Sequence, residues 1–253
     1  DIIIKHADIR RSLMNMKSLI EGQRSLAFWV SQQIDVSLNH PDKKIKTNAD
    51  EIVALMTPII KSFFTDIGME ITNDAIQVFG GYGYTKDQGI EQLFRDNRIT
   101  PIYEGTNSVQ AIDLVYRKIL NNKIFEKYIA QLSNEVKDFA KDNKLSLFAD
   151  KFFKYLELLN NFTLWLGEKN KSSKDDVSAA CNDYLKVLGY IALAHSWLKI
   201  LKVSHSKLKE NKTFYEDKIN TAKYYFDKIL PRVQSHYLSA ITGSDTMMKS
   251  NFN

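Results

Sequence analysis

A glutamate in a turn-rich segment is the first candidate for chemistry. Glu104 stands in the run IYEGT, after Pro101 and directly before Gly105. The helix predicted to begin just after it would turn its positive end toward this carboxylate and favour the ionised form, whereas burial beside Ile102 and Tyr103 would favour the neutral acid. A carboxyl group balanced between these two effects suits a general base. By spacing alone, an ordinary acidic helix start is the simpler interpretation.

The one glycine-dense stretch of the chain, QVFGGYGY at residues 77–84, is the second candidate. A helix is predicted to end there, with the backbone bending through Gly80 and Gly81, which tolerate positive φ and let a ligand approach the main chain. No strand precedes the stretch and its spacing is not GxGxxG, so a dinucleotide-binding turn of the Rossmann type is excluded. By spacing alone, a helix C-cap followed by a turn is favoured.

Metal sites and nucleophile sites are not indicated. His195 and His205 are ten residues apart on one predicted helix, which places them on nearly opposite faces. Ser196 is next to His195 in sequence, which is not the geometry of a nucleophile and its base. The single cysteine, Cys181, excludes a disulfide framework, and we expect it to be a small buried residue.

Apolar residues recur at helical spacing almost throughout, and no strand pattern of useful length occurs, so we predict an all-α fold. A loop over 37–50 separates the first two helices, Asn48 or Asp50 caps the second, and Pro58 kinks it or delays its start. The predicted helices cover residues 9–34, about 50–79, 89–94, 107–120, 122–142, 146–169, 174–209 and 213–242.

The composition divides the chain into two predicted domains. Hydrophobic residues are 44% and charged residues 26%, which is typical of a folded globular chain. Residues 1–120 carry a net charge of −1, whereas residues 121–253 carry +6 and almost no Gly or Pro. We therefore place a boundary at the Asn121-Asn122 pair and predict that 121–253 forms a second, antiparallel helical bundle. We find no apolar run near the roughly 18 residues that would span a membrane.

The glycine stretch and the glutamate loop belong to one longer pattern at residues 77–110. Its elements are Gln-x-Phe-Gly-Gly-x-Gly-Tyr, then Leu-x-Arg-Asp, then Ile-Tyr-Glu-Gly-Thr. This order resembles the signature of the acyl-CoA dehydrogenase flavoproteins, and the resemblance covers about residues 6–120, which match the C-terminal helical domain of that family. The run HADIRRSLMNMKSLIEGQRSLAFW is similar to the branch of 3-(methylthio)propionyl-CoA dehydrogenase-like enzymes, whose extra helical domain fits residues 122–253.

The resemblance implies a catalytic role for Glu104. It matches the base that removes the α-proton of an acyl-CoA thioester, while a hydride leaves the β-carbon for N5 of FAD. Thr106 and Gln110 match cofactor-binding positions at the start of the following helix. Ser108 stands where many members of the family have Gln.

The glycine turn is assigned to the cofactor by the same resemblance. Gln77, Gly80 and Gly81 match the turn that contacts the adenosine-diphosphate end of FAD, in this family from a neighbouring subunit. A homo-oligomer is therefore implied, with electron-transfer flavoprotein as the electron acceptor. No metal is implied.

The resemblance also implies that parts of the enzyme lie outside this chain. A full member of the family has an N-terminal helical domain and a middle β-domain before this region, so we expect a fragment that binds FAD weakly or not at all by itself. The opening DIIIKHADIRR shows neither signal-peptide nor transit-peptide character, and we expect a cytoplasmic location.

Two other functions are compatible with the sequence. The charge of residues 121–253 is what a nucleic-acid-binding flavoprotein of the alkylation-response branch would use. We rank this lower, because 15 acidic residues dilute the lysines and Arg232 is the only arginine there. The second alternative is a non-catalytic helical module for oligomerisation.

Overall fold

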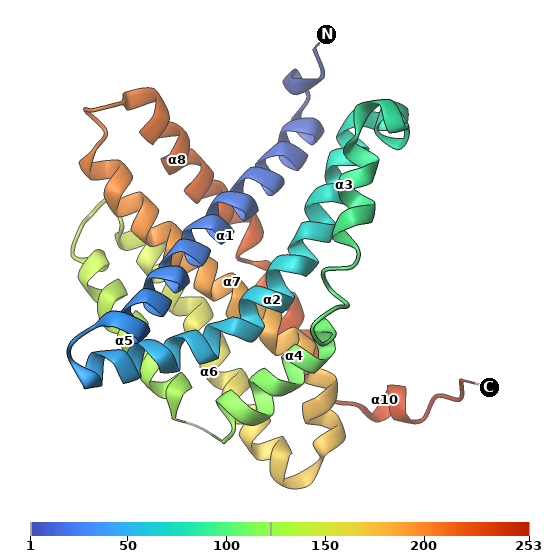
Figure 1. Ribbon diagram of the computed structural model, residues 1–253, viewed down its shortest axis with the longest axis vertical. Helices are drawn as coiled ribbons and strands as arrows, with labels where there is room; N and C mark the ends of the chain where they lie inside the picture. The colour runs from blue at the N-terminus through green and yellow to red at the C-terminus, as the bar shows by residue number, and fades with distance from the viewer. Residues whose placement is uncertain (1, 122, 253) are drawn as a thin grey trace.

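The computed structural model describes residues 2–121 and 123–252, and every regular element in that part of the chain is a helix (Figure 1). The all-α prediction is therefore confirmed. Two π-helical segments, Leu114–Ile119 and Tyr225–Ile229, continue α4 and α8. The α-helices are α1 (Ala7–Asn39), α2 (Lys43–Phe79), α3 (Ile90–Asn97), α4 (Asn107–Asp113), α5 (Ile124–Ala140), α6 (Ser146–Ser172), α7 (Lys174–Ser206), α8 (Lys212–Tyr224), α9 (Arg232–Ala240) and α10 (Asp245–Met248).

The connection between α1 and α2 is much shorter than predicted. Helix α2 begins at Lys43, because Asp42 accepts hydrogen bonds from the backbone N–H groups of Lys44 at 2.7 Å and Ile45 at 3.2 Å. These bonds satisfy donors that a helix start otherwise leaves open. The predicted loop over 37–50 and the predicted caps Asn48 and Asp50 were wrong, since the polar residues after Asp42 form an exposed first part of the helix.

Helix α2 continues through Pro58 without ending, and Figure 1 shows that its axis changes direction part-way along. By length and composition, the stretch Lys43–Tyr84 could cross a membrane. This was not predicted from the sequence. However, 44% of its most apolar window is buried inside the fold. Its buried residues, among them Leu55, Met56 and Ile59, belong to the hydrophobic core.

The last predicted helix, 213–242, is interrupted. Helix α8 and its π-helical continuation end at Ile229, and α9 begins at Arg232 directly after Pro231. Proline fixes φ and has no N–H to donate, so it favours a new helix start over a continuous helix.

Helix α7 is the centre of the core. It lies against α1, α2 and α4 as well as α5, α6, α8 and α9, and every residue from Val187 through Leu198 is buried. At Gly189 a Cβ atom would lie 2.5 Å from the Phe63 ring of α2, so a glycine is needed for this close approach. Residues from both predicted domains thus share one hydrophobic core.

The domain boundary itself stays a prediction. Asn122, on which the boundary partly depended, lies outside the described residues. Cys181 is buried, as expected, and burial raises the pKa of its thiol to about 12. Among the described residues, no group of histidine, cysteine and acidic side chains could hold a metal ion.

His195 is a titratable residue inside this core. Its Nε2 atom lies 3.0 Å from Oε2 of Glu135 on α5, and its side chain is almost fully buried. Burial lowers the pKa of His195 and outweighs the opposite effect of the Glu135 hydrogen bond. The folded protein therefore holds this imidazole in its neutral form near neutral pH.

We predict that the free energy of unfolding decreases as the pH falls from 7.5 to 5.5. Below about pH 6.5 this histidine is protonated in the unfolded chain but not in the folded chain. The slope of the free energy of unfolding against pH therefore reaches at most about 1.4 kcal/mol per pH unit. Urea titrations at pH 7.5, 6.5 and 5.5 should give a shallower pH dependence for His195→Gln than for the unsubstituted chain. His6→Gln, at an exposed histidine just before α1, is the control. Identical slopes for all three proteins would refute the role of His195.

Candidate functional site

The loop between α3 and α4 holds Glu104 in an unusual backbone conformation. Its φ is +57°, the one positive φ of a non-glycine residue in the described part of the chain. Gly105 follows with φ +83°. A side chain in this left-handed region costs about 1–2 kcal/mol relative to a right-handed conformation. Strained residues of this kind concentrate at functional sites, because elsewhere a glycine would remove the strain.

Two side chains hold the loop in place. Nζ of Lys61 on α2 donates to the carbonyl oxygen of Gly105 at 2.7 Å and to Oδ1 of Asn107 at 2.8 Å. Nε2 of Gln110 donates to the carbonyl oxygen of Glu104 at 3.1 Å. The backbone of Glu104 and Gly105 is therefore tied both to α2 and to α4.

Asn107 joins the start of α4 to the middle of α2. Its Nδ2 atom lies 2.6 Å from Oδ1 of Asp66, 3.0 Å from Oγ1 of Thr65 and 3.1 Å from the carbonyl oxygen of Ser62. Lys61 could not be found from the local sequence, because it lies 44 positions before the carbonyl that it binds. Asn107 could have been suspected from its place as the first residue of the helix predicted over 107–120.

Thr106 and Gln110, predicted to contact a cofactor, are both part of this loop structure. Thr106 is the N-cap of α4, and its Oγ1 accepts from the backbone N–H of Val109 at 3.4 Å. Gln110 binds the Glu104 carbonyl, as described above. The structure thus brings Glu104, Thr106 and Gln110 together, while their predicted roles toward a cofactor stay predictions.

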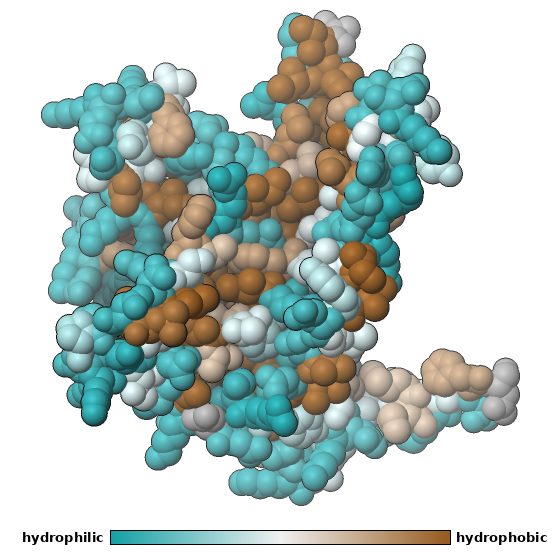
Figure 2. Space-filling view, in the orientation of Figure 1, coloured by the Kyte–Doolittle hydropathy of each residue, from teal (hydrophilic) through white to brown (hydrophobic). Residues whose placement is uncertain are grey.

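The side chains around Glu104 are uncovered. Glu104 is exposed, and the burial expected beside Ile102 and Tyr103 is absent, since these side chains are 45% and 52% exposed. Leu93, Ile99 and other large apolar residues nearby are also exposed. Figure 2 shows apolar surface at the edge of the molecule near the segment between α3 and α4. An exposed apolar surface of this kind is typical of an interaction site.

The predicted glycine turn forms at the end of α2. Gly80 caps the helix with φ +61°, and residues Gly80–Tyr84 form a 3-10 turn. Gly81 has no positive φ, and no heavy atom lies within 4 Å of a Cβ placed there. Neither backbone conformation nor packing inside the described chain requires this glycine. Gln77, one turn before the cap, is exposed.

The structure does not bring the glycine turn and the glutamate loop together. The loop is tied to α2 at Lys61, whereas the turn follows Phe79 at the end of that helix. The 18 intervening residues correspond to roughly 27 Å of helix. Figure 1 shows the turn at the far end of α2, beside α3. Side chains at both places cannot reach one small group within a single copy of the chain.

Comparison with known protein families matches most of the chain. Residues 1–120 match the family described as "Acyl-CoA dehydrogenase, C-terminal domain", and residues 132–251 match "Acetyl-CoA dehydrogenase C-terminal like". A 3-methylmercaptopropionyl-CoA dehydrogenase of Ruegeria pomeroyi is 38% identical over 120 residues, which are 47% of this chain and 20% of that protein. A butyryl-CoA dehydrogenase of Syntrophomonas wolfei is 28% identical over 242 residues, or 91% of this chain and 39% of that protein.

Solved structures share the fold over nearly the whole chain. The acyl-CoA dehydrogenase of Bacillus anthracis, crystallised with FAD, has a TM-score of 0.74 at 15% identity and covers 97% of this chain. ACDH-11 of Caenorhabditis elegans, crystallised with C11-CoA, has a TM-score of 0.70 at 19% identity and covers 96%. This chain spans 44% and 40% of those two structures, and 20% and 39% of the two curated relatives.

We predict that glycine is more stabilising than alanine at position 104. At ordinary φ, alanine is better than glycine by about 0.5–1 kcal/mol, but a left-handed φ reverses the order because alanine keeps the strain. Urea unfolding should therefore give Glu104→Gly a larger free energy of unfolding than Glu104→Ala, by about 1 kcal/mol. The same pair of substitutions at the exposed residue Glu126, inside α5, should show the usual order. The usual order at both positions would mean that Glu104 is not strained.

Proposed function

The chain belongs to the acyl-CoA dehydrogenase family through its two C-terminal helical regions, and from this premise we propose that it is the C-terminal part of an FAD-dependent acyl-CoA dehydrogenase. In the proposed reaction, an acyl-CoA thioester loses a proton from Cα and a hydride from Cβ and becomes a trans-2-enoyl-CoA. The observation that carries the proposal is the strained, exposed Glu104, held by Lys61 and Gln110.

Glu104 is the base in this proposal. Its carboxylate accepts the α-proton, which then resides on a carboxylate oxygen. A base must come within hydrogen-bond reach of the proton that it removes, and a displacement of about 1 Å can lower the rate about 100-fold. Lys61 and Gln110 restrict such displacement, because Lys61 binds the carbonyl oxygen of Gly105 and Gln110 binds that of Glu104.

The residues present are compatible with FAD, which when bound would supply the oxidant by accepting the hydride. Gly81 leaves the main chain open to close approach, and nothing inside the described chain explains a glycine there. Thr106 and Gln110 stand next to the base at the start of α4. We propose that these residues, with Gln77 and Gly80, contact the cofactor.

The remaining surface supports a larger assembly. The apolar side chains around Glu104 need a cover, which the N-terminal and β-domains of a complete family member would provide. Since the glycine turn lies roughly 27 Å along α2 from the loop, we propose that it serves the site of a second copy in a homo-oligomer. We further propose electron-transfer flavoprotein as the acceptor and the cytoplasm as the location.

A chimaera tests the assignment of the base. The chain replaces the corresponding C-terminal region of the Syntrophomonas wolfei butyryl-CoA dehydrogenase, and flavin absorbance is followed after anaerobic addition of butyryl-CoA. We predict that Glu104→Gln retains FAD but slows flavin reduction at least 100-fold, the usual range for loss of a general base. Glu126→Gln, at an exposed glutamate of α5, should leave the rate unchanged. Rapid reduction in a Glu104→Gln chimaera that holds FAD would refute the proposed base.

The isolated chain gives a separate prediction about the cofactor. After dialysis against FAD, the chain alone should retain little flavin absorbance, because its candidate cofactor residues lie on exposed, separated surfaces. The chimaera should retain the cofactor. A stoichiometric yellow complex of the isolated chain would contradict the requirement for the additional domains.

A further inference from the structure

A groove lies where α8 spreads away from α1 above the C-terminal part of α7 (Figure 1). Its volume is about 690 Å³, within the range of small-molecule sites. Apolar side chains from all three helices line it: Ile20 is 38% exposed, and Val203 and Phe214 are each 49% exposed. The groove shares no residue with the Glu104 loop.

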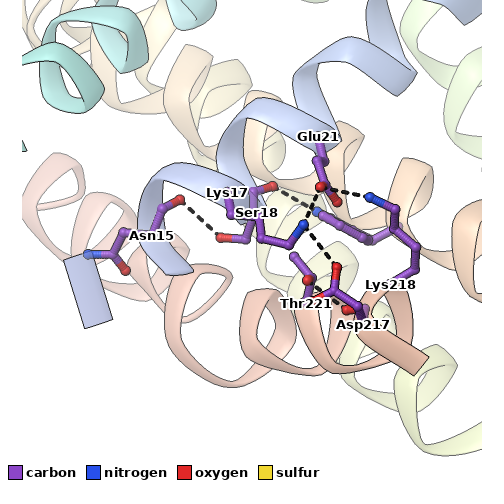
Figure 3. Close-up of polar contacts among 8 residues, drawn as sticks. Asn15, Lys17, Ser18, Glu21, Asp217, Lys218 and Thr221 are labelled. Atoms are coloured by element: carbon purple, nitrogen blue, oxygen red, sulfur yellow. Dashed lines mark hydrogen bonds and ion pairs between the residues drawn. The ribbon is translucent and has the colours of Figure 1, made fainter. Parts of the chain in front are cut away.

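Glu21 and Lys218, which line one wall of the groove, belong to a network of ion pairs in which each lysine already has a carboxylate partner. Oε1 of Glu21 accepts from Lys17 at 2.6 Å and from Lys218 at 2.7 Å, and Lys17 also lies 3.0 Å from Asp217 (Figure 3). Two lysines thus face two carboxylates. The ammonium of Lys218 also lies 4.9 Å from the centre of the Phe214 ring. These groups fix the shape of the wall and leave no net charge on it.

A third lysine of the groove is also paired. Nζ of Lys199 on α7 lies 3.5 Å from Oε1 of Glu135 and 5.0 Å from the centre of the Trp29 ring. Arg24 of α1 also lines the groove, but its exposed side chain has no hydrogen-bond or ion-pair partner among the described residues. One positive charge beside the apolar surface is therefore unmatched.

We propose that this groove binds an amphipathic monoanion, a molecule with one carboxylate and an unbranched hydrocarbon chain. The carboxylate pairs with the guanidinium of Arg24, whose fork of N–H donors matches the two oxygens of a carboxylate. The hydrocarbon chain covers Ile20, Val203 and Phe214. The ligand carries one negative charge because the groove has one unmatched positive charge. It must also fit within the groove's volume of about 690 Å³.

The test uses the full chain and decanoate below its micelle concentration, with the neutral analogue decanol as the comparison. Isothermal titration calorimetry should show one saturable site that prefers decanoate to decanol. Arg24→Gln should weaken decanoate binding about tenfold and leave decanol binding unchanged, as expected for loss of one charge-assisted contact. Arg10→Gln, at another exposed arginine of α1, should change neither affinity. Val203→Glu should weaken both ligands by placing a charge on the apolar surface.

Three results would overturn the proposal. The first is the absence of saturable decanoate binding. The second is an affinity for decanoate that Arg24→Gln does not change. The third is a dimer, measured by light scattering, that Val203→Glu dissociates, because the groove would then be an interface between two copies of this chain. None of these outcomes depends on FAD, so they are distinct from a failure of the dehydrogenase assignment.

Discussion

The burial of α7 on nearly every side is the constraint on which the fold depends. Its central residues, Val187 through Leu198, are all buried, and a helix buried on every side needs neighbours in every direction. Those neighbours come from both halves of the sequence: α1, α2 and α4 from one half, and α5, α6, α8 and α9 from the other. Removing residues 1–120 would expose the side of α7 that packs against α1, α2 and α4 to water. The two matched family regions are thus packed around one shared helix.

The helices themselves could largely be predicted from apolar periodicity, and the errors have local causes. The polar residues after Asp42 resembled a loop because that part of α2 is exposed on most sides, and a single carboxylate decides where the helix begins. The break before Arg232 depends on Pro231 and on the π-helical turn that precedes it. Periodicity alone does not reveal such a turn, because its extra residue changes the phase of the helix rather than its composition.

The candidate site was predictable in residue type and order but not in geometry. The order of Glu104, Thr106 and Gln110 after the glycine turn was enough to select these residues. The positive φ of Glu104 was not predictable, because glutamate rarely adopts it and no local signal favours it. Its supports are tertiary: Lys61 of α2 lies 44 positions before the Gly105 carbonyl that it binds, and Asp66 lies 41 positions before Asn107. The length of α2 also separates the loop from the glycine turn.

Two unmatched charges of opposite sign distinguish the two candidate sites. The Glu104 carboxylate has no hydrogen-bond or ion-pair partner among the described residues, although the chain fixes its backbone on both sides. The Arg24 guanidinium lacks a partner in the same sense, although each lysine around it is paired with a carboxylate. A carboxylate without a partner remains free to accept a proton, and a guanidinium without a partner remains free to bind an anion. Because Glu104 lies in the loop before α4 and Arg24 lies on α1, the proposed proton removal and the proposed anion binding share no residue.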